Sequence, residues 1–278
     1  MTPNAESKPW PGADHPGVNT ELHPDAAPSW LRPLANSLVG EHPAPSAEFE
    51  RRRARASAHP APRQAREEQQ SAAQQQGSAR QGFRGQPSGS QAGAAVLIAL
   101  AGSSPDTARV LLTHRSPGMR SHAGQIAFPG GRIDSQDVNP VDAALREAWE
   151  ETGLDRAAVT PIAQLDALTV TRSARPIFPV IAHWHSPARV GVASPRETDH
   201  VFTANLAELA QASRRMTVTW RSHTGPAFRC NGYVIWGFTA AVLAGILELG
   251  GWAKPWNREP AVALEEALAS SRNNEPPR

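Results

Sequence analysis

The sequence predicts an α/β protein with three layers, in which a mixed β-sheet lies between helices (an α/β/α sandwich). Two observations predict this class. Short apolar runs typical of strands recur after residue 93. Helical patterns alternate with these runs and can cover both faces of one sheet. The predicted strands are residues 94–100, 110–113, 162–170, 177–184 and 217–220.

The N-terminal third, residues 1–93, has a composition that opposes folding. It is rich in Pro, Ala, Gln and Arg, and only two aromatic residues occur between 41 and 92. Such a segment buries too little apolar surface to offset chain entropy, so we expect it to be largely disordered. One short apolar run within it predicts a helix over residues 29–38.

A well-delimited helix follows the second predicted strand. Asn139 can cap free backbone N–H groups, Pro140 suits the first helical position and Gly153 favours a stop. Between these signals, apolar residues recur at the spacing of one buried helix face. That face consists of Val141, Leu145, Ala148 and Trp149. The glutamates of the helix are expected on its opposite side.

Three glutamates of this helix form the candidate catalytic and metal-binding centre. Glu147 and Glu151 are four residues apart and therefore neighbours on the helix surface, with Glu150 close enough to join them. Carboxylates packed this tightly repel one another unless a cation lies among them, and Mg²⁺ or Mn²⁺ suits oxygen ligands. Arg146 is expected to pair with Glu150 and orient the carboxylates. A solvated acidic face is the alternative, but it does not explain the preceding FPGG or the glycine stop.

The segment FPGGRIDSQDVNPVDAALREAWEETGL, which contains this helix, resembles the signature of the Nudix hydrolases. Its last part, REAWEETGL, has the order Arg, Glu, small, any, Glu, Glu, any, Gly, apolar. The resemblance covers residues 94–252. It implies the Nudix fold, which is a three-layer α/β/α sandwich, and cleavage of a nucleoside diphosphate linked to another group.

The preceding segment, LLTHRSPGMRSHAGQIAFPGG, is similar to a second signature, that of the coenzyme A pyrophosphatases. Asp137 stands where the general Nudix pattern has Glu, with one extra residue before Arg146, and the coenzyme A subfamily shares this shift. Coenzyme A carries a 3′-phosphate besides its diphosphate, so its site needs additional cations. The substrate-binding residues implied are Arg115, Arg120, Gly124, Gly130 and Gly131, the glycines letting the backbone approach phosphate oxygens.

The resemblance implies hydrolysis of the diphosphate bond of coenzyme A or its thioesters, with Mg²⁺ or Mn²⁺ as cofactor. The products would be 3′,5′-adenosine bisphosphate and (acyl-)4′-phosphopantetheine. The general base is open among Glu147, Glu150 and a downstream carboxylate such as Glu197 or Glu208. Two alternatives are a Nudix pyrophosphatase for another nucleotide (ADP-ribose, NADH or a nucleoside triphosphate) and a catalytically idle Nudix domain that binds a nucleotide or RNA.

The C-terminal half adds two predicted helices. Asn205 can cap a short one, and residues 239–249 form the second. The tract 230–247 carries no charge, but polar and glycine residues interrupt it and its helical part is too short to span a membrane, so a buried core helix is expected. The folded domain is expected to end at residue 254, and residues 255–278 to form a flexible tail.

Composition limits the remaining function classes. The single cysteine, Cys230, allows neither an intramolecular disulfide nor a multi-cysteine zinc site. A formal net charge of +2 gives no reason for steering onto nucleic acid. The Nudix resemblance implies a small nucleotide as the partner, with no membrane, and nucleic acid is not expected as a partner. No signal peptide is visible, so a cytoplasmic location is expected. The preferred form of coenzyme A and the oligomeric state do not follow from the sequence.

Overall fold

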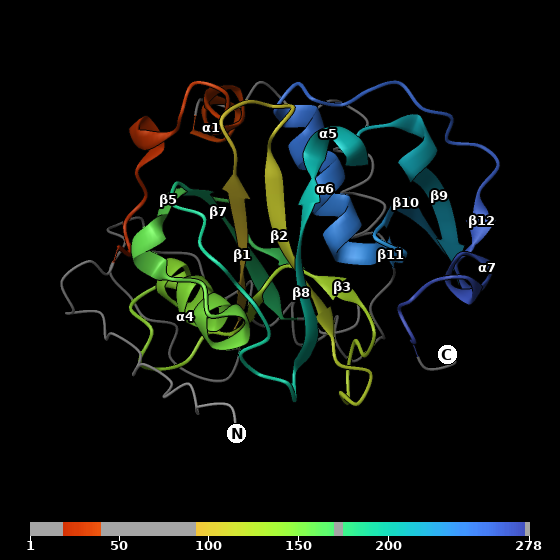
Figure 1. The fold of residues 1–278 in the computed structure, drawn as a ribbon, viewed down its shortest axis with the longest axis horizontal. Helices are drawn as coiled ribbons and strands as arrows, with labels where there is room; N and C mark the ends of the chain where they lie inside the picture. The colour runs from red at the N-terminus through yellow and green to blue at the C-terminus, as the bar shows by residue number, and fades with distance from the viewer. Residues whose placement is uncertain (1–18, 40–92, 170–174, 276–278) are drawn as a thin grey trace, which may run out of the picture.

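The computed structural model describes residues 19–39, 93–169 and 175–275 (Figure 1). The disorder predicted for residues 1–18 and 40–92 lies outside these ranges. Within them, the predicted three-layer arrangement is confirmed. A mixed sheet lies between α4 (Pro140–Thr152) on one face and α6 (Gly237–Leu249) on the other.

The mixed sheet is built around β1 (Ala94–Ala101), which pairs in parallel with β7 (Pro176–Trp184) and antiparallel with β2 (Arg109–Arg115). Its other members are β3 (Ile126–Ala127), β4 (Gly130–Arg132), β5 (Val159–Gln164), β6 (Leu168–Thr169) and β8 (Thr198–Asn205). The predicted strand 162–170 is divided, because β5 and β6 pair with successive parts of β7. The sequence does not predict β3, β4 or β8, since the first two are very short and the third is largely polar.

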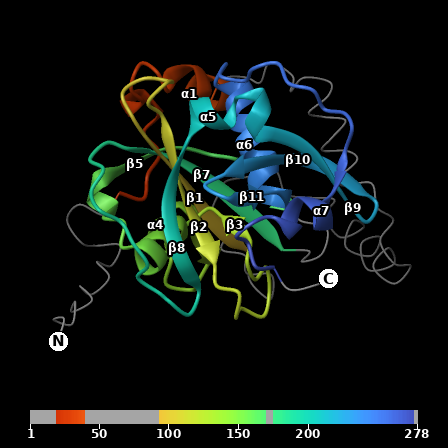
Figure 2. The same cartoon turned by 45° about the vertical axis from the view of Figure 1, so that its right-hand side comes forward.

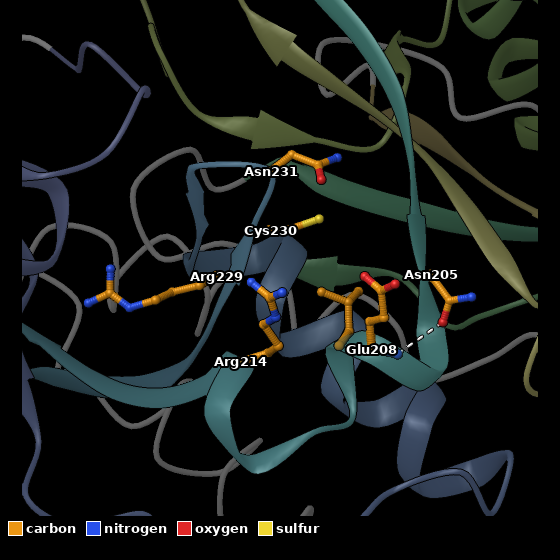
Figure 3. Close-up of a pocket in the computed structure, with 7 residues that line it drawn as sticks. Asn205, Glu208, Arg214, Arg229, Cys230 and Asn231 are labelled. Carbon is orange, nitrogen blue, oxygen red and sulfur yellow. Dashed lines mark hydrogen bonds between the residues drawn. The ribbon is translucent and has the colours of Figure 1, made fainter.

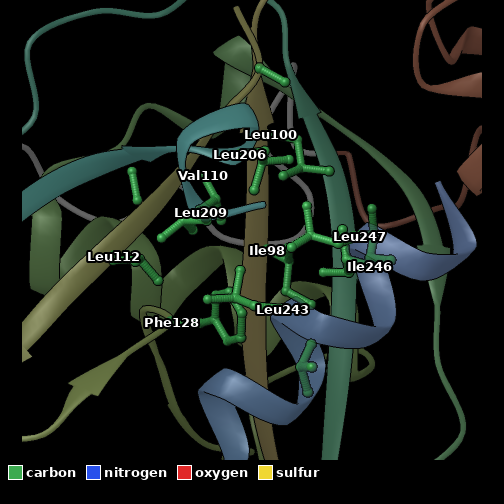
Figure 4. Packing of buried hydrophobic residues seen from close by; sticks show 14 of the residues in the cluster. Ile98, Leu100, Val110, Leu112, Phe128, Leu206, Leu209, Leu243, Ile246 and Leu247 are labelled. Atoms are coloured by element: carbon green, nitrogen blue, oxygen red, sulfur yellow. The ribbon is translucent and has the colours of Figure 1, made fainter. Parts of the chain in front are cut away.

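Successive residues of β1 support the two helical layers. Leu97 lies in one core cluster with Leu145 of α4. Its neighbour Ile98 lies in the other cluster, with Leu243 and Leu247 of α6 (Figure 4). Side chains of a strand alternate between the two faces of a sheet, so a strand covered on both sides is apolar throughout. This two-sided burial explains the run AAVLIALA of β1.

Helix α4 begins and ends where the sequence predicts. Oδ1 of Asn139 accepts a hydrogen bond from the N–H of Asp142 at 2.9 Å, and Gly153 ends the helix with a left-handed φ of 70°. The predicted apolar face is buried at Val141, Leu145 and Ala148 and half-buried at Trp149. The helix is more enclosed than predicted, because Asp142, Arg146 and Glu151 are also buried.

A second sheet lies beside the sandwich (Figure 2). It contains β9 (Arg215–Trp220), β10 (His223–Cys230), β11 (Tyr233–Ile235) and β12 (Val262–Ala263), and α7 (Leu264–Ala269) follows β12. The expectation of a flexible tail from residue 255 is wrong for this part of the chain. β12 adds an edge strand to β9, and Leu264, Ala267 and Asn273 are buried.

The described N-terminal segment packs on the sandwich. Helix α1 (Arg32–Val39), preceded by the 3-10 turn η1 (Pro24–Ala26), corresponds to the helix predicted over residues 29–38. Trp30, Leu31 and Leu34 are buried in the same core cluster as α6. The N-terminal region is therefore not uniform, since one piece of it completes the core.

The remaining helical elements are short. Asn205 caps α5 (Leu206–Leu209) as predicted, because its Oδ1 accepts from the N–H of Glu208 at 2.9 Å. Two 3-10 turns, η2 (Arg156–Ala158) and η3 (Ala212–Arg214), precede β5 and β9. Helix α6 is the buried core helix that the sequence predicts. In the described ranges, no helix combines the length and apolarity needed to cross a membrane.

Candidate active site

The C-terminal half of α4 arranges two of the predicted glutamates around one arginine. Arg146 is buried, and its Nη1 lies 3.0 Å from Oε1 of Glu147 and 3.3 Å from Oε2 of Glu150. The side chain of Glu147 is 14% exposed, whereas that of Glu150 is 42% exposed. The expected pairing of Arg146 with Glu150 is present, and Glu147 shares the same nitrogen.

The opposite edge of the Arg146 guanidinium is held by Asp137. Nε and Nη2 of Arg146 donate to Oδ1 and Oδ2 of Asp137 at 2.8 and 2.9 Å. Nη2 also donates to the backbone oxygen of Arg132 at 2.9 Å. Asp137 is fully buried and raises the pKa of Arg146, despite the opposing effect of burial. The sequence gives Asp137 no ligand role, and the structure shows that it orients the arginine.

Glu151 has different partners from its two neighbours. Its buried carboxylate accepts a hydrogen bond from the N–H of Gly130 at 3.2 Å, and Nη1 of Arg115 lies 3.9 Å away. Gly130 belongs to β4 and Arg115 ends β2. The glutamate helix, the FPGG strand and the predicted substrate arginine therefore meet at Glu151.

Burial is the main electrostatic feature of the carboxylates. It raises the pKa of Glu147 to about 7, although Arg146 acts in the opposite direction. It raises the pKa of Glu151 to about 8, although Arg115 and the Gly130 N–H oppose the shift. Glu197, in the segment before β8, raises the pKa of both glutamates further. Negative charge is therefore in excess at this place, and Glu197 belongs to the same cluster.

The metal-site prediction requires the three glutamates to converge on one point, and in the structure they do not. Among the described residues, no three His, Cys, Asp or Glu side chains are grouped so that they could hold a metal ion. The reason lies in their partners. Glu147 and Glu150 both contact Arg146, whereas Glu151 contacts Gly130 and is close to Arg115. Local positive groups thus draw the carboxylates apart.

Gly131 allows the close approach of Glu147 to β4. A Cβ atom at this position would overlap the carboxylate group of Glu147. Only glycine leaves that space open, because every other residue carries a Cβ. The structure therefore explains this glycine by its contact with a candidate ligand, whereas the sequence gives it a direct role at phosphate oxygens. Gly130 is explained by a different contact, because a Cβ atom there would overlap the backbone oxygen of Ala95 in β1.

The two predicted substrate arginines are placed differently. The side chain of Arg115 is 19% exposed beside Glu151, and its buried Nε has no hydrogen-bond partner among the described residues. Arg120 lies exposed in the loop between β2 and β3 and makes no ion pair within the described part of the chain. The structure thus brings Arg115 to the carboxylates and leaves Arg120 at the surface.

Gly124 lies under the C-terminal segment. Its φ is 74°, and a Cβ atom there would overlap the backbone oxygen of Asn273. Nδ2 of Asn273 donates to the backbone oxygen of Gly124 at 3.0 Å. The contact with Asn273 thus explains why residue 124 is a glycine. The sequence instead predicts that Gly124 lets the backbone approach phosphate oxygens. No pattern in the sequence connects residues 124 and 273.

Glu208, a candidate general base in the sequence, lies elsewhere. It is part of α5 and lines a cavity of about 30 Å³ together with Arg214 and Cys230 (Figure 3). None of the carboxylates of α4 lines this cavity. Burial raises the pKa of the Cys230 thiol to about 11, which keeps this thiol protonated and unreactive near neutral pH. Glu197 is therefore the downstream carboxylate near α4.

Comparison with known proteins identifies the family. A family model of the Nudix domain matches residues 91–228. The chain is 34% identical to the uncharacterized Nudix hydrolase NudL of Klebsiella pneumoniae. This alignment of 153 residues covers 48% of this chain and 71% of that protein. The chain belongs to the Nudix hydrolase family. A NudL of Enterobacter, also uncharacterized, is 33% identical over 169 residues, or 54% of this chain and 78% of that protein. The solved Nudix hydrolase RenU of M. smegmatis aligns with a TM-score of 0.43 at 23% identity, over 60% of this chain and 91% of that one.

Membership in the Nudix family establishes the fold and the general chemistry. The three-layer sandwich with its mixed sheet is the Nudix fold. Nudix hydrolases generally use divalent metals such as Mg²⁺ or Mn²⁺. Both segments that form the carboxylate cluster, FPGG and REAWEETGL, lie within the matched range.

Proposed function

We propose that this Nudix hydrolase cleaves the diphosphate bond of coenzyme A or its thioesters. The products are 3′,5′-adenosine bisphosphate and 4′-phosphopantetheine or its acyl form. The observation that carries the proposal is the position of Arg115, a fixed residue of the coenzyme A pyrophosphatase signature, with Nη1 3.9 Å from the Glu151 carboxylate. A diphosphate substrate requires a positively charged side chain beside the glutamate helix, and Arg115 supplies one.

The chemistry of the donor set suits a hard divalent cation, although the three carboxylates do not converge on one point among the described residues and binding would have to draw them together. Glu147, Glu150 and Glu151 supply only carboxylate oxygens, the ligands that Mg²⁺ and Mn²⁺ prefer. Two of these carboxylates have raised pKa values because they are buried with too little positive charge. When bound, the metal neutralises phosphate charge and lowers the pKa of a water molecule. Glu151 and Glu147 would hold it, with Glu150 as a further ligand.

The chain's own residues orient the reaction. Arg115 would bind a phosphate oxygen through its guanidinium group, whose Nε has no hydrogen-bond partner among the described residues. Arg146 fixes the orientation of Glu147 and Glu150, and Asp137 fixes Arg146. Arg120, which is exposed in the loop between β2 and β3, would bind the 3′-phosphate.

The general base is a carboxylate that reaches the attacking water. Glu150 and Glu197 are the best placed, because Glu150 is part-exposed and Glu197 lies close to both buried glutamates. Glu208 is removed from consideration by its position on α5. The pH–rate profiles of Glu150→Gln and Glu197→Gln decide between the two, because only loss of the base removes the acidic limb.

The test is Mg²⁺-dependent turnover of coenzyme A beside 3′-dephospho-coenzyme A and ADP-ribose, with products separated by chromatography. We expect preferential release of 3′,5′-adenosine bisphosphate from coenzyme A. Glu151→Gln should abolish turnover, and Arg120→Ala should raise KM for coenzyme A without changing KM for its 3′-dephospho form. Arg229→Ala, in the second sheet, is the matched control for a lost surface arginine.

Other outcomes discriminate between the alternatives. Equal or better cleavage of the compounds without a 3′-phosphate would retain Nudix chemistry and reject the coenzyme A assignment. Nucleotide binding without turnover, unchanged in Glu151→Gln, would support an idle binding domain.

A further inference from the structure

The C-terminal segment is tied to the end of β2 by one buried asparagine. Asn273 is fully buried, and its side chain bridges two separate pieces of chain. Its Nδ2 donates to the backbone oxygen of Gly124 at 3.0 Å and to that of Val234 at 3.1 Å, while its Oδ1 accepts from the N–H of Val234 at 2.8 Å. The amide therefore joins β11 to the loop between β2 and β3.

The backbone of Asn273 makes a second attachment to the same region. Its carbonyl oxygen is 2.9 Å from Nε2 of His114, a buried residue of β2. Nδ1 of His114 is hydrogen-bonded to Asp199 of β8. The two ring nitrogens of His114 thus join the backbone of Asn273 to β8.

These two attachments lie on either side of Arg115. His114 precedes Arg115 in the chain, and the register between β2 and β8 shifts between these two residues. Gly124 and Gln125 are the backbone partners of Arg115 across the loop: its N–H donates to the oxygen of Gln125 at 2.9 Å, and its oxygen accepts from Gly124 at 3.0 Å. Asn273 thus holds both the residue before Arg115 and the loop residue opposite it, Gly124.

We propose that Asn273 is a positioning residue for Arg115, so that the C-terminal segment sets the geometry of the phosphate-binding arginine. An irregular strand end with a positive-φ glycine opposite it has little stiffness of its own. Buried hydrogen bonds from a third segment supply that stiffness, because a buried amide left without hydrogen-bond partners is destabilising. The consequence for substrate rests on the proposed function, but the ordering of residues 114–125 does not.

The ordering is tested by hydrogen–deuterium exchange on the full chain. Asn273→Asp keeps the shape and the acceptor of the side chain and removes the donor to Gly124. It should speed exchange of the Arg115 and Gln125 amides by about tenfold or more, with the amides of α4 unchanged. Arg272→Ala is the matched control, because this exposed neighbour contacts Tyr233 and Asn231 and not the loop. It should leave exchange in residues 114–125 unchanged.

Kinetics test the effect on substrate. Asn273→Asp should raise KM for coenzyme A by about tenfold, within the range seen when a supporting residue of a site is replaced, and alter kcat less. In the Arg115→Ala background the same change should have less than about a threefold effect, because residues that act through one another are not additive. Asn273→Ser, a smaller side chain, provides a second variant if Asn273→Asp does not fold.

The outcomes separate this inference from the proposed function. Faster exchange at Arg115 in a protein that does not cleave coenzyme A would support the positioning role and reject the substrate. Full additivity with Arg115→Ala, or exchange that increases equally throughout the domain, would show that Asn273 only stabilises the fold and would overturn the inference.

Discussion

Arg146 donates two hydrogen bonds to the carboxylate of Asp137, of 2.8 Å from Nε to Oδ1 and 2.9 Å from Nη2 to Oδ2. Only Nη1 is left to face the candidate site, where it contacts Glu147 and Glu150. The buried aspartate therefore decides how the arginine presents itself to the carboxylates. Asp137 stands where the general Nudix pattern has Glu, with one extra residue before Arg146. In this structure the shorter side chain orients Arg146.

Removing either partner of this pair should destabilise the protein. Arg146→Ala leaves a fully buried carboxylate without its counter-charge, and breaking a buried ion pair in this way typically costs about 3–5 kcal/mol. Urea denaturation measures the loss. Asp134→Asn is the control, since the Asp134 side chain is 54% exposed and 3.9 Å from Nη2 of Arg146. An equal effect of the two changes would contradict the structural role of Asp137.

A methyl group at Gly131 should disturb the carboxylate of Glu147, a proposed metal ligand. In Gly131→Ala the new Cβ overlaps the Glu147 carboxylate, so the glutamate must move. We expect Mg²⁺ activation of turnover to weaken by about 10- to 100-fold, the range typical of displaced metal ligands and their supports. Gly225→Ala in β10 is the matched control, because its Cβ would have no neighbour within 4 Å. Unchanged Mg²⁺ dependence in Gly131→Ala would remove Glu147 from the ligand set.

The metal-free protein should lose stability as the pH rises. The folded-state pKa values of Glu147 and Glu151 are raised from 4.5 to about 7 and about 8. Between the unfolded-state pKa of 4.5 and these raised values, the folded protein holds protons that the unfolded chain has released. The contribution of these two groups to stability is therefore greatest below about pH 4.5 and is lost as the pH rises through about 8. Because one pKa unit corresponds to about 1.4 kcal/mol, the loss is on the order of several kcal/mol for the two groups together.

Thermal unfolding in chelator, followed from pH 5 to pH 9, measures this dependence. Glu151→Gln should flatten it, because the amide does not ionise. Mg²⁺ should raise Tm more at pH 8 than at pH 5, since it competes with protons for the same carboxylates. A Tm that rises with pH in the wild type, and equally in Glu151→Gln, would be inconsistent with the raised pKa values.

Local signals were sufficient for several elements. The cap at Asn139, the stop at Gly153 and the apolar face of α4 follow from chemistry within a few residues, and the structure has all three. The same is true of α5 and its cap at Asn205. The second sheet, in contrast, is assembled from strands such as β10, whose exposed and half-buried residues give no clear alternation.

The candidate site likewise has features that the sequence predicts and features that only the tertiary structure shows. Sequence alone determined which residues are available: the REAWEETGL glutamates, the FPGG glycines and Arg115, because their types and spacing are local properties of the chain. Only the tertiary structure decided their partners. Arg146 turns to Asp137, Glu151 to Gly130 and Arg115, and Gly124 to Asn273, 149 residues away. Such contacts depend on how strands and loops pack in three dimensions, which no short pattern encodes.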